Sequence, residues 1–545
     1  MTLKDTSGLG ISTSEEAKEN FRDLKTRKKP VKTIQEDEEL IDMTFNKKKA
    51  DDRKEWLKSY EPGIYLNHNA KEISIKDFVN KESILFSRTN NERSIPNILD
   101  GFKLGQRKVL YTCIKKKYKN EIKVASLAGA VLAEAAYHHD DFSIRGATIV
   151  AMAQDFIGSN NINILHGVGQ FGTRSQGGKD AASARCISVT VPKLTRLIFH
   201  PQDDGLLTYC SDDGQIVEPE WYLPIIPMIL VNGSESIGTG YNIYIPSYNP
   251  QDIVNNLKLM IDGRKPVPMH PWYRGFRGCI EQTGEDKYKV CGTIEPVNNG
   301  SGVRITELPI RVWTQNYKEQ LEQWISGTEK VPAWIIGYKE NHSIANINFT
   351  VQLTEEKLNN ALEEGLEKKF KLNTNINTSN MVCLDGKGRI KKYSSAEEIL
   401  LEFYDYRLEY YYKRKNHMLK VLELEVNQLR NKARFIQMKI DHNLVFEGLH
   451  KTEIIKLLES EGFEKFRNIK EGQSGNGYDY LMNTKSRSFC EEEAQKLENK
   501  KTKKEKEFNV LQKKTPQEIW KEDLDAFLNE CNVSIETLNT HILHL

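Results

Sequence analysis

The sequence predicts an α+β protein of several domains, with a long antiparallel coiled coil in its C-terminal part. Three observations predict this class: a length of 545 residues, a strand-rich segment from about 228 to 393, and a stretch without Gly or Pro at 394–447. At roughly 100–200 residues per domain, the length corresponds to about three or four domains. Apolar residues make up 38% of the chain and charged residues 28%, which excludes global disorder.

The predicted elements follow the chain in order. Residues 1–60 are highly charged, which favours an exposed docking or linker segment. Across 61–227, short helical patterns are separated by Gly, Pro and Asn, as in a compact α-rich domain with small strands. Across 228–393 strand patterns dominate. Phe349 and Val351, for example, alternate with polar residues, so we expect a sheet with one buried face.

The strongest periodic pattern lies after residue 393. Apolar residues there step by three and four, as in the seam of a coiled coil: Leu419, Leu422, Val426, Leu429, Ala433, Ile436 and Ile440. A weaker register follows at Cys490, Ala494, Leu497, Lys501, Lys504, Phe508 and Leu511. Because the segment between the two is long enough to reverse direction, we expect an antiparallel pair of helices. The alternative is a surface helix packed on a globular body.

The charge balance and the cysteines exclude several classes of function. Basic and acidic residues number 78 and 76, a net charge of +2, so overall basicity does not attract nucleic acid. None of the eight cysteines forms a C-x-x-C pair, which argues against a zinc ribbon and a disulfide framework and favours a reducing compartment. The longest apolar run, 221–231, is too short to span a bilayer, and the first residues do not form a leader, so we expect no membrane partner.

Positive charge is concentrated between residues 103 and 123. This segment holds eight basic residues and one acidic residue, a net charge of +7, with aromatic and apolar residues interleaved. One helical face can therefore be buried while the other meets phosphates; a solvated charged face is the alternative interpretation. The glycine-rich stretches 167–172 and 177–179 match no nucleotide-binding loop, and the adjacent His138 and His139 favour hydrogen bonds or phosphate contacts over a metal site.

Several longer motifs resemble one known family. They are Ser94-Ile-Pro-Asn-Ile-Leu-Asp-Gly-Phe-Lys-Leu-Gly-Gln-Arg-Lys-Val-Leu110, Gly169-Gln-Phe-Gly-Thr-Arg174, Gly177-Gly-Lys-Asp-Ala-Ala-Ser-Ala-Arg185, Glu218-Pro-Glu-Trp-Tyr-Leu-Pro224 and Ile237-Gly-Thr-Gly240. Together they resemble the DNA-gate core of eukaryotic type IIA DNA topoisomerases. The resemblance implies a Toprim remnant and linker at 1–60, a winged-helix DNA-binding domain at 61–227, a tower domain at 228–393, a coiled-coil C-gate for dimerisation at 394–524 and a tail at 525–545.

The family's chemistry needs a tyrosine that attacks a DNA phosphate, an arginine that stabilises the developing charge, and Mg²⁺ and ATP bound in other domains. By resemblance the arginine is Arg185, but the next position, tyrosine in the family, is Cys186. A cysteine sulfur lies roughly 4 Å closer to its own Cα than a tyrosine oxygen does, so we expect Cys186 to be an inert, buried thiol. No Mg²⁺-site motif or ATPase segment precedes Gly8, so we expect no cofactor in this chain.

The resemblance also implies a set of DNA-binding residues. In the family, the matching positions line the DNA channel or, for Ile237, form an apolar wedge that bends the duplex. The residues at the channel positions are Arg93, Lys103, Arg107, Lys108, His138, His139, Arg174, Lys179 and Arg185. Asp140 and Asp141 depart from the family pattern and would repel phosphate. The alternative interpretation is a set of surface charges and a core isoleucine.

We therefore expect a nuclear, chromosome-associated protein that binds duplex DNA as a dimer and does not cut it independently. It would act in chromosome segregation and the resolution of sister chromatids, as a homodimer or as a heterodimer with a full-length topoisomerase II. Two alternatives stay open: the DNA-gate subunit of a split ATP-dependent topoisomerase, and a coiled-coil scaffold that binds no DNA.

Overall fold

The structure is a computed structural model, and its contacts divide the chain into two compact units. The body unit comprises Met1–Pro201, Leu207–Arg407 and Asp523–Leu545, and the coiled-coil unit comprises Gln202–Leu206 and Leu408–Glu522. For 142–145 and 533–543 only the backbone is described. The described residues are 18, 21–22, 29–34, 37–67, 70–136, 142–297, 302–327, 332–342, 346–446, 448–466, 477–484 and 489–543.

The N-terminal part of the body unit is mainly helical. Its elements are β1 (Val31–Lys32), α3 (Asp37–Phe45), α4 (Ala50–Lys58), β2 (Ile73–Ser74), α5 (Ile75–Phe78), η1 (Val79–Ser83) and α6 (Ile84–Ser94). Strands β1 and β2 pair in parallel. Trp56, Val79 and Ile84 form a small buried cluster, so a helix of the charged segment before residue 60 packs on η1 and α6.

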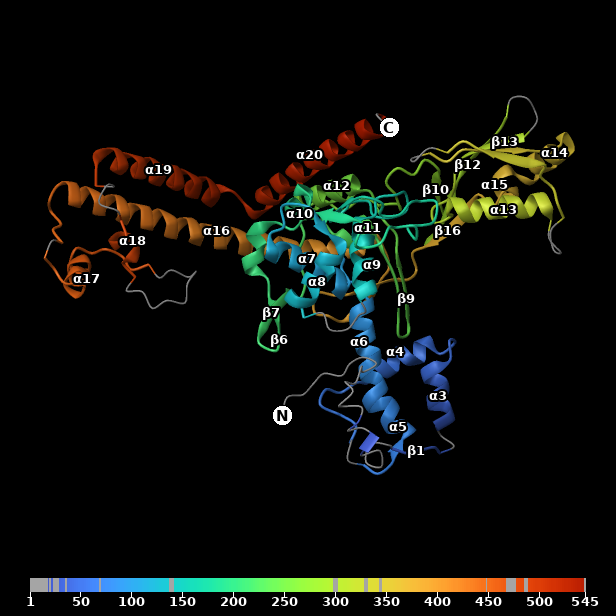
Figure 1. The fold of residues 1–545 in the computed structure, drawn as a ribbon, viewed down its shortest axis with the longest axis horizontal. Coiled ribbons are helices and arrows are strands. Elements are labelled where there is room, and N and C mark those ends of the chain that lie inside the picture. The colour runs from blue at the N-terminus through green and yellow to red at the C-terminus, as the bar shows by residue number, and fades with distance from the viewer. Residues whose placement is uncertain are drawn as a thin grey trace. The chain divides into compact units, whose positions relative to one another are not determined.

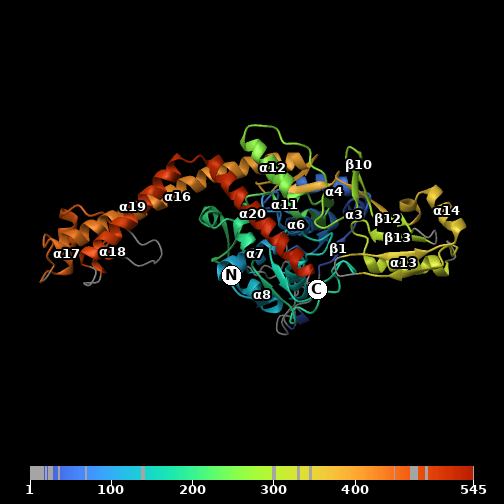
Figure 2. The ribbon, with the colours of Figure 1, turned by 90° about the horizontal axis from the view of Figure 1, so that it is seen from above.

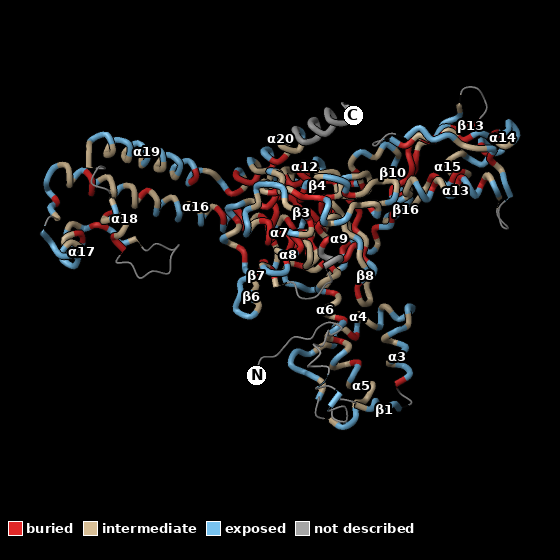
Figure 3. Tube along the Cα trace, viewed as in Figure 1, coloured by how far each residue is buried: buried red, intermediate tan, exposed pale blue. Residues whose placement is uncertain are grey.

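Three helices and a small antiparallel sheet follow. The helices are α7 (Leu104–Lys116), α8 (Val124–Glu134) and α9 (Phe142–Ala153), and the sheet has the order β3 (Ile122–Lys123), β5 (Ser188–Thr190), β4 (His166–Val168). Apolar side chains of α7 and α8, such as Leu110 and Val131, are completely buried. Figure 3 shows this buried core around α7, α8 and β3. These packed helices support the loop that joins β4 to β5.

Two hairpins and four helices follow. They are α10 (Lys193–Ile198), η2 (Pro201–Leu206), β6 (Tyr209–Asp212), β7 (Gln215–Pro219), α11 (Met228–Asn232), β8 (Ser234–Gly238), β9 (Tyr241–Ile245) and α12 (Pro250–Ile261). Residues 202–206 of the 3-10 helix η2 belong to the coiled-coil unit. The pairs β6–β7 and β8–β9 are antiparallel. Helix α11 is buried over most of its length, which explains the apolar run around residue 228 without a membrane. No helix within the described part is long and apolar enough to cross a bilayer.

The strand-rich segment contains two larger antiparallel sheets, where we expected one sheet with a buried face. One has the order β10 (Cys279–Gly284), β11 (Lys287–Cys291), β16 (Asn373–Asn377), and the other β12 (Thr293–Pro296), β13 (Gly302–Glu307), β15 (Phe349–Gln352), β14 (Gly337–Glu340). The remaining elements are α13 (Thr314–Ser326), α14 (Glu355–Glu364), α15 (Leu366–Lys369), β17 (Met381–Leu384) and β18 (Ile390–Tyr393). Phe349 and Val351 are fully buried in the core below the four-stranded sheet, which confirms the predicted alternation.

The predicted antiparallel helix pair is confirmed. Helix α16 (Ala396–Ile440) runs beside α19 (Glu491–Lys513), as Figures 1 and 2 both show. Glu425 lies 3.0 Å from Lys504, and Lys415 Nζ donates to the carbonyl oxygen of Gln512 at 3.1 Å, so the sequence numbers run in opposite directions. The far end is closed by α17 (Lys451–Ser460) and α18 (Asp479–Met482), which pack on Ile436. Helix α20 (Pro516–Leu543) then leads into the body unit.

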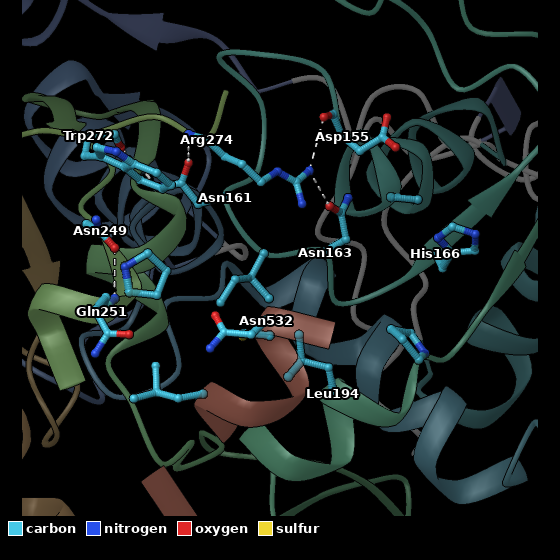
Figure 4. A pocket seen from close by; sticks show the side chains of 16 residues that line it. Asp155, Asn161, Asn163, His166, Leu194, Asn249, Gln251, Trp272, Arg274 and Asn532 are labelled. Atoms are coloured by element: carbon cyan, nitrogen blue, oxygen red, sulfur yellow. Dashed lines mark hydrogen bonds between the residues drawn. The ribbon is translucent and has the colours of Figure 1, made fainter. Parts of the chain in front are cut away.

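A pocket of about 360 Å³ in the body unit shows how distant segments are joined (Figure 4). The Arg274 guanidinium donates to the backbone oxygen of Asp155 at 3.1 Å and to Oδ1 of Asn163 at 3.0 Å. Its backbone N–H donates to Oδ1 of Asn161 at 2.9 Å. Burial lowers the pKa of Arg274. Arg274 thereby fastens the segment between α12 and β10 to the residues after α9.

Candidate nucleic-acid interface

The loop between β4 and β5 carries the motif around Arg185, and its shape depends on two glycines. Gly177 and Gly178 have positive φ values of 61° and 80°. A Cβ atom on Gly177 would overlap the indole of Trp313, and one on Gly178 would overlap the side-chain amide of Gln154. Glycine is therefore required at Gly177 by conformation and by space, and at Gly178 by its left-handed conformation.

Hydrogen bonds inside the loop hold its course. Asp180 accepts from the backbone N–H of Thr173 at 2.8 Å and from Thr173 Oγ1 at 2.6 Å. Burial acts to raise the pKa of Asp180, but these hydrogen bonds outweigh it and the pKa is lowered. Gln154 Nε2 donates to the backbone oxygens of Phe171 and Gly178, which ties the loop to the end of α9. These hydrogen bonds therefore hold the loop in one conformation.

Arg185 and Cys186 lie on a tight turn at the end of this loop, and both side chains are exposed. The N–H of Cys186 donates to the carbonyl oxygen of Ser183 at 2.8 Å, and Lys123 Nζ donates to the carbonyl oxygen of Cys186 at 3.0 Å. The expectation of a buried thiol at 186 is therefore wrong. The turn directs this side chain outward, whereas the next residue, Ile187, is buried.

A groove of about 600 Å³ runs between α9 and the loop. The helix contributes Gly146, Ala147 and Ala151, which are small enough to let a large ligand approach the backbone. The loop contributes Lys179 and Arg185, both exposed. The arrangement is a shallow groove with cations on one wall, which suits an extended anionic polymer.

The structure places Arg107 and Lys108 differently from the expectation. The Arg107 guanidinium lies 2.6 Å from the buried carboxylate of Asp100, and Lys108 Nζ lies 2.8 Å from Glu218 and donates to the carbonyl oxygen of Ala135. Both residues are less than 10% exposed. This corrects the idea that they face a DNA channel, because a buried cation requires an internal anion and each has one.

Arg174 and Lys103 are also engaged with the protein. Arg174 lies 2.5 Å from Glu307 and donates to the backbone oxygen of Leu308 at 2.8 Å. Lys103 Nζ donates to the backbone oxygen of Glu235 at 2.7 Å, and burial lowers its pKa. Arg174 therefore braces the loop against β13, and Lys103 is half-buried beside β8.

The remaining predicted residues divide into accessible and undescribed ones. Arg93 is half-buried in the last turn of α6, and Ile237 is 80% exposed on the β8–β9 hairpin. The exposure of Ile237 rules out the alternative of a core isoleucine. His138 and His139 lie outside the described residues. Among the described residues, no group of three or more His, Cys, Asp or Glu side chains is placed to hold a metal ion.

Comparison with known proteins assigns the chain to a family. Residues 93–525 match the family described as the A-type subunit of DNA gyrase/topoisomerase IV, and residues 2–91 match the C-terminal associated domain of TOPRIM. The chain belongs to the type II topoisomerases. It is 44% identical to DNA topoisomerase 2-beta of Homo sapiens over 97% of this chain and 35% of that protein, and 44% identical to DNA topoisomerase 2 of Penicillium chrysogenum over 96% and 34%.

A solved structure supports the same assignment. The DNA-binding, cleavage and re-ligation domain of Plasmodium falciparum topoisomerase II superposes with a TM-score of 0.83 and 40% sequence identity, over 98% of this chain and 75% of that chain. The type II topoisomerase fold thus extends through nearly all of the sequence. This chain spans about a third of the length of the two topoisomerase 2 relatives.

One residue of this topoisomerase site was not singled out from the sequence. Lys123 belongs to the basic segment 103–123, but nothing in its local pattern distinguishes it from its neighbours. The pairing of β3 with β5 brings Lys123 into the site, because it places Lys123 opposite Ser188 and next to the Cys186 carbonyl. Strand pairing across 65 residues cannot be read from local periodicity.

Proposed function

We propose that this chain binds duplex DNA across the groove between α9 and the β4–β5 loop and does not cut the DNA by itself. The observation that carries the proposal is the exposed, fixed turn that presents Arg185 together with Cys186 in place of a tyrosine. The site has basic side chains that can bind phosphate, but the side chain at position 186 is shorter than the tyrosine of the family.

Binding is supported by the charges that remain accessible. Lys179 and Arg185 line the groove, and Lys123 lies beside the same turn. Ile237 offers an exposed apolar side chain on a hairpin, which is the type of group that inserts between base steps and bends a duplex. Arg107 and Lys108 contribute to this surface indirectly, by holding α7 in place.

The absence of cutting follows from geometry. A cysteine sulfur lies roughly 4 Å nearer its Cα than a tyrosine oxygen, and an ångström of misplacement can cost about a hundredfold in rate. The hydrogen bonds at Ser183 and Lys123 hold the backbone on both sides of residue 186, so the turn has little freedom to move the sulfur forward.

The cellular role belongs to the same proposal. The chain acts on chromosomes in the nucleus during segregation, as a dimer with itself or with a full-length topoisomerase II, and needs no cofactor of its own for binding DNA. Support comes from its similarity to eukaryotic topoisomerases 2 and from the long antiparallel helix pair. Affinity capture from nuclear extract, probed for topoisomerase II, tests the partner.

Duplex binding is tested by salt titration of the purified chain on a short duplex. Each neutralised phosphate contributes a slope of about 0.9 in log affinity against log salt, so Lys179→Ala and Arg185→Ala should each reduce the slope by about one. Lys318→Ala, which removes an ion pair with Glu340 outside the groove, is the matched control. No binding at low salt would favour a protein scaffold instead.

The absence of cutting is tested with supercoiled plasmid, Mg²⁺ and ATP. We expect no relaxation and no covalent protein–DNA adduct from the wild-type chain. Cys186→Tyr, assayed with an added ATPase–Toprim polypeptide, asks whether only the nucleophile separates this chain from one half of a split enzyme. An adduct formed at Cys186 itself would contradict the proposal.

A further inference from the structure

Two cysteines lie directly opposite each other on neighbouring strands of the body unit. Cys279 on β10 pairs with Cys291 on β11 in antiparallel register. Both are free thiols. Directly opposite residues share one face of a sheet with Cβ atoms about 4.5–5.5 Å apart, and a disulfide needs about 3.5–4.5 Å. A small approach of the two side chains is enough to join them.

A carboxylate is placed to take the proton of the inner thiol. Glu367 on α15 interacts with the Cys291 thiol and raises its pKa, and Lys289 Nζ donates to Glu367 at 3.1 Å. Burial, Cys279 and Glu367 together raise the pKa of Cys291 to about 12, whereas Lys289 lowers the pKa of Glu367. The thiol is therefore protonated, and Glu367 is an ionised acceptor beside it.

Access differs between the two sulfurs. Cys279 lies on the edge strand of its sheet and is exposed, whereas Cys291 on the central strand is buried. A small oxidant from solution reaches Cys279 first, and Cys291 is then the nearest thiol to react with the product. This order makes Cys279 the cysteine that reacts with the oxidant and Cys291 the resolving cysteine.

We propose that Cys279 and Cys291 form a reversible disulfide when the chain meets a peroxide. The Cys279 thiolate attacks one peroxide oxygen, the O–O bond breaks, and the displaced oxygen leaves as hydroxide, which becomes water with the proton released from Cys279. The resulting sulfenic acid is attacked by the Cys291 sulfur. The S–O bond breaks, and this hydroxide takes the proton that Glu367 has received from Cys291. Two thiols and one peroxide thus give one disulfide and two waters, and a dithiol reverses the change.

The test is treatment of the full chain with hydrogen peroxide under native conditions, alkylation of free thiols and tryptic digestion without reduction. Lys287 and Lys289 lie between the two cysteines, so trypsin separates them into different peptides. We expect these two peptides to be recovered joined, and to separate after dithiothreitol. Recovery of both cysteines as separate alkylated or over-oxidised peptides would overturn the proposal.

Substitution of single cysteines separates the roles of the two sulfurs. Cys279→Ser should leave Cys291 alkylated and unoxidised; oxidation of Cys291 at the wild-type rate would refute the stated order. Cys383→Ser, which removes a buried thiol on β17, should leave the joined peptide unchanged.

Glu367→Gln tests the proton acceptor. It should slow disulfide formation at least about tenfold and let a dimedone adduct accumulate at Cys279, because the sulfenic acid then waits for Cys291. The matched control is Glu364→Gln, since Glu364 pairs with Lys369 at 3.0 Å in the same region. Equal rates in the two variants would show that Glu367 does not take the proton.

Discussion

At the scale of single residues, Arg107 and Lys108 of α7 act as internal anchors. Asp100 accepts a hydrogen bond from the Arg107 guanidinium. It also accepts from the backbone N–H groups of Phe102 and Tyr222, both at 3.0 Å. Asp100 is completely buried. Removal of its cationic partner would leave an uncompensated charge in the core, which is far more costly than the loss of a surface ion pair.

We therefore expect Arg107→Ala to lower the free energy of unfolding of the body unit by about 3–5 kcal/mol. Lys258→Ala, which removes a partly exposed pair with Asp525, should cost about 0.2–1 kcal/mol. Urea denaturation followed by circular dichroism measures both. Similar losses for the two variants would mean that the Arg107–Asp100 pair is not buried in solution.

The pH dependence of the β4–β5 loop follows from Asp180. Its pKa in the folded protein is below the ordinary value of about 4, so the ionised carboxylate stabilises the loop above that pH. This contribution disappears as the pH falls through the lowered pKa of the folded state. The melting temperatures of wild type and Asp180→Asn should therefore differ at pH 7 and converge once the pH has fallen below the lowered pKa of the folded state. A difference independent of pH would contradict this account.

At the scale of elements, the same loop depends on close packing against a tryptophan. Gly177→Ala combines a left-handed backbone with an overlap on Trp313, and we expect it to displace the loop and weaken duplex binding by about tenfold or more. Gly214→Ala is the matched control, because Gly214 also has a positive φ, 80°, but nothing lies near its Cβ position. It should cost only about 1 kcal/mol in stability and leave binding unchanged.

At the scale of the whole molecule, the coiled-coil unit has a core cluster of its own. Ile436 is completely buried in a cluster made only of residues from the coiled-coil unit. Ile436→Ala should lower the stability of that unit by about 2–5 kcal/mol. Amide hydrogen exchange should accelerate within 408–522 and stay unchanged in α7 and α8; Val421→Ala, at a site 40% exposed, should change neither. Faster exchange throughout the chain would indicate one cooperative core.

The local patterns of the sequence determined the α+β class, the one-sided burial around Phe349 and the antiparallel helix pair. Periodicity depends only on neighbouring residues, so it can be read directly. Family motifs identified the loop with Arg185 and Cys186 in the same way, because each motif is a continuous string.

Only the tertiary structure decided which basic residues reach the surface. Lys108 is buried because Glu218, 110 residues away, lies beside it, and Cys186 is exposed because Lys123 and Ser183 hold its turn. The pairing of Cys279 with Cys291 likewise depends on the register of two strands. Burial and proximity are properties of the assembled chain, since they depend on partners that are distant in sequence.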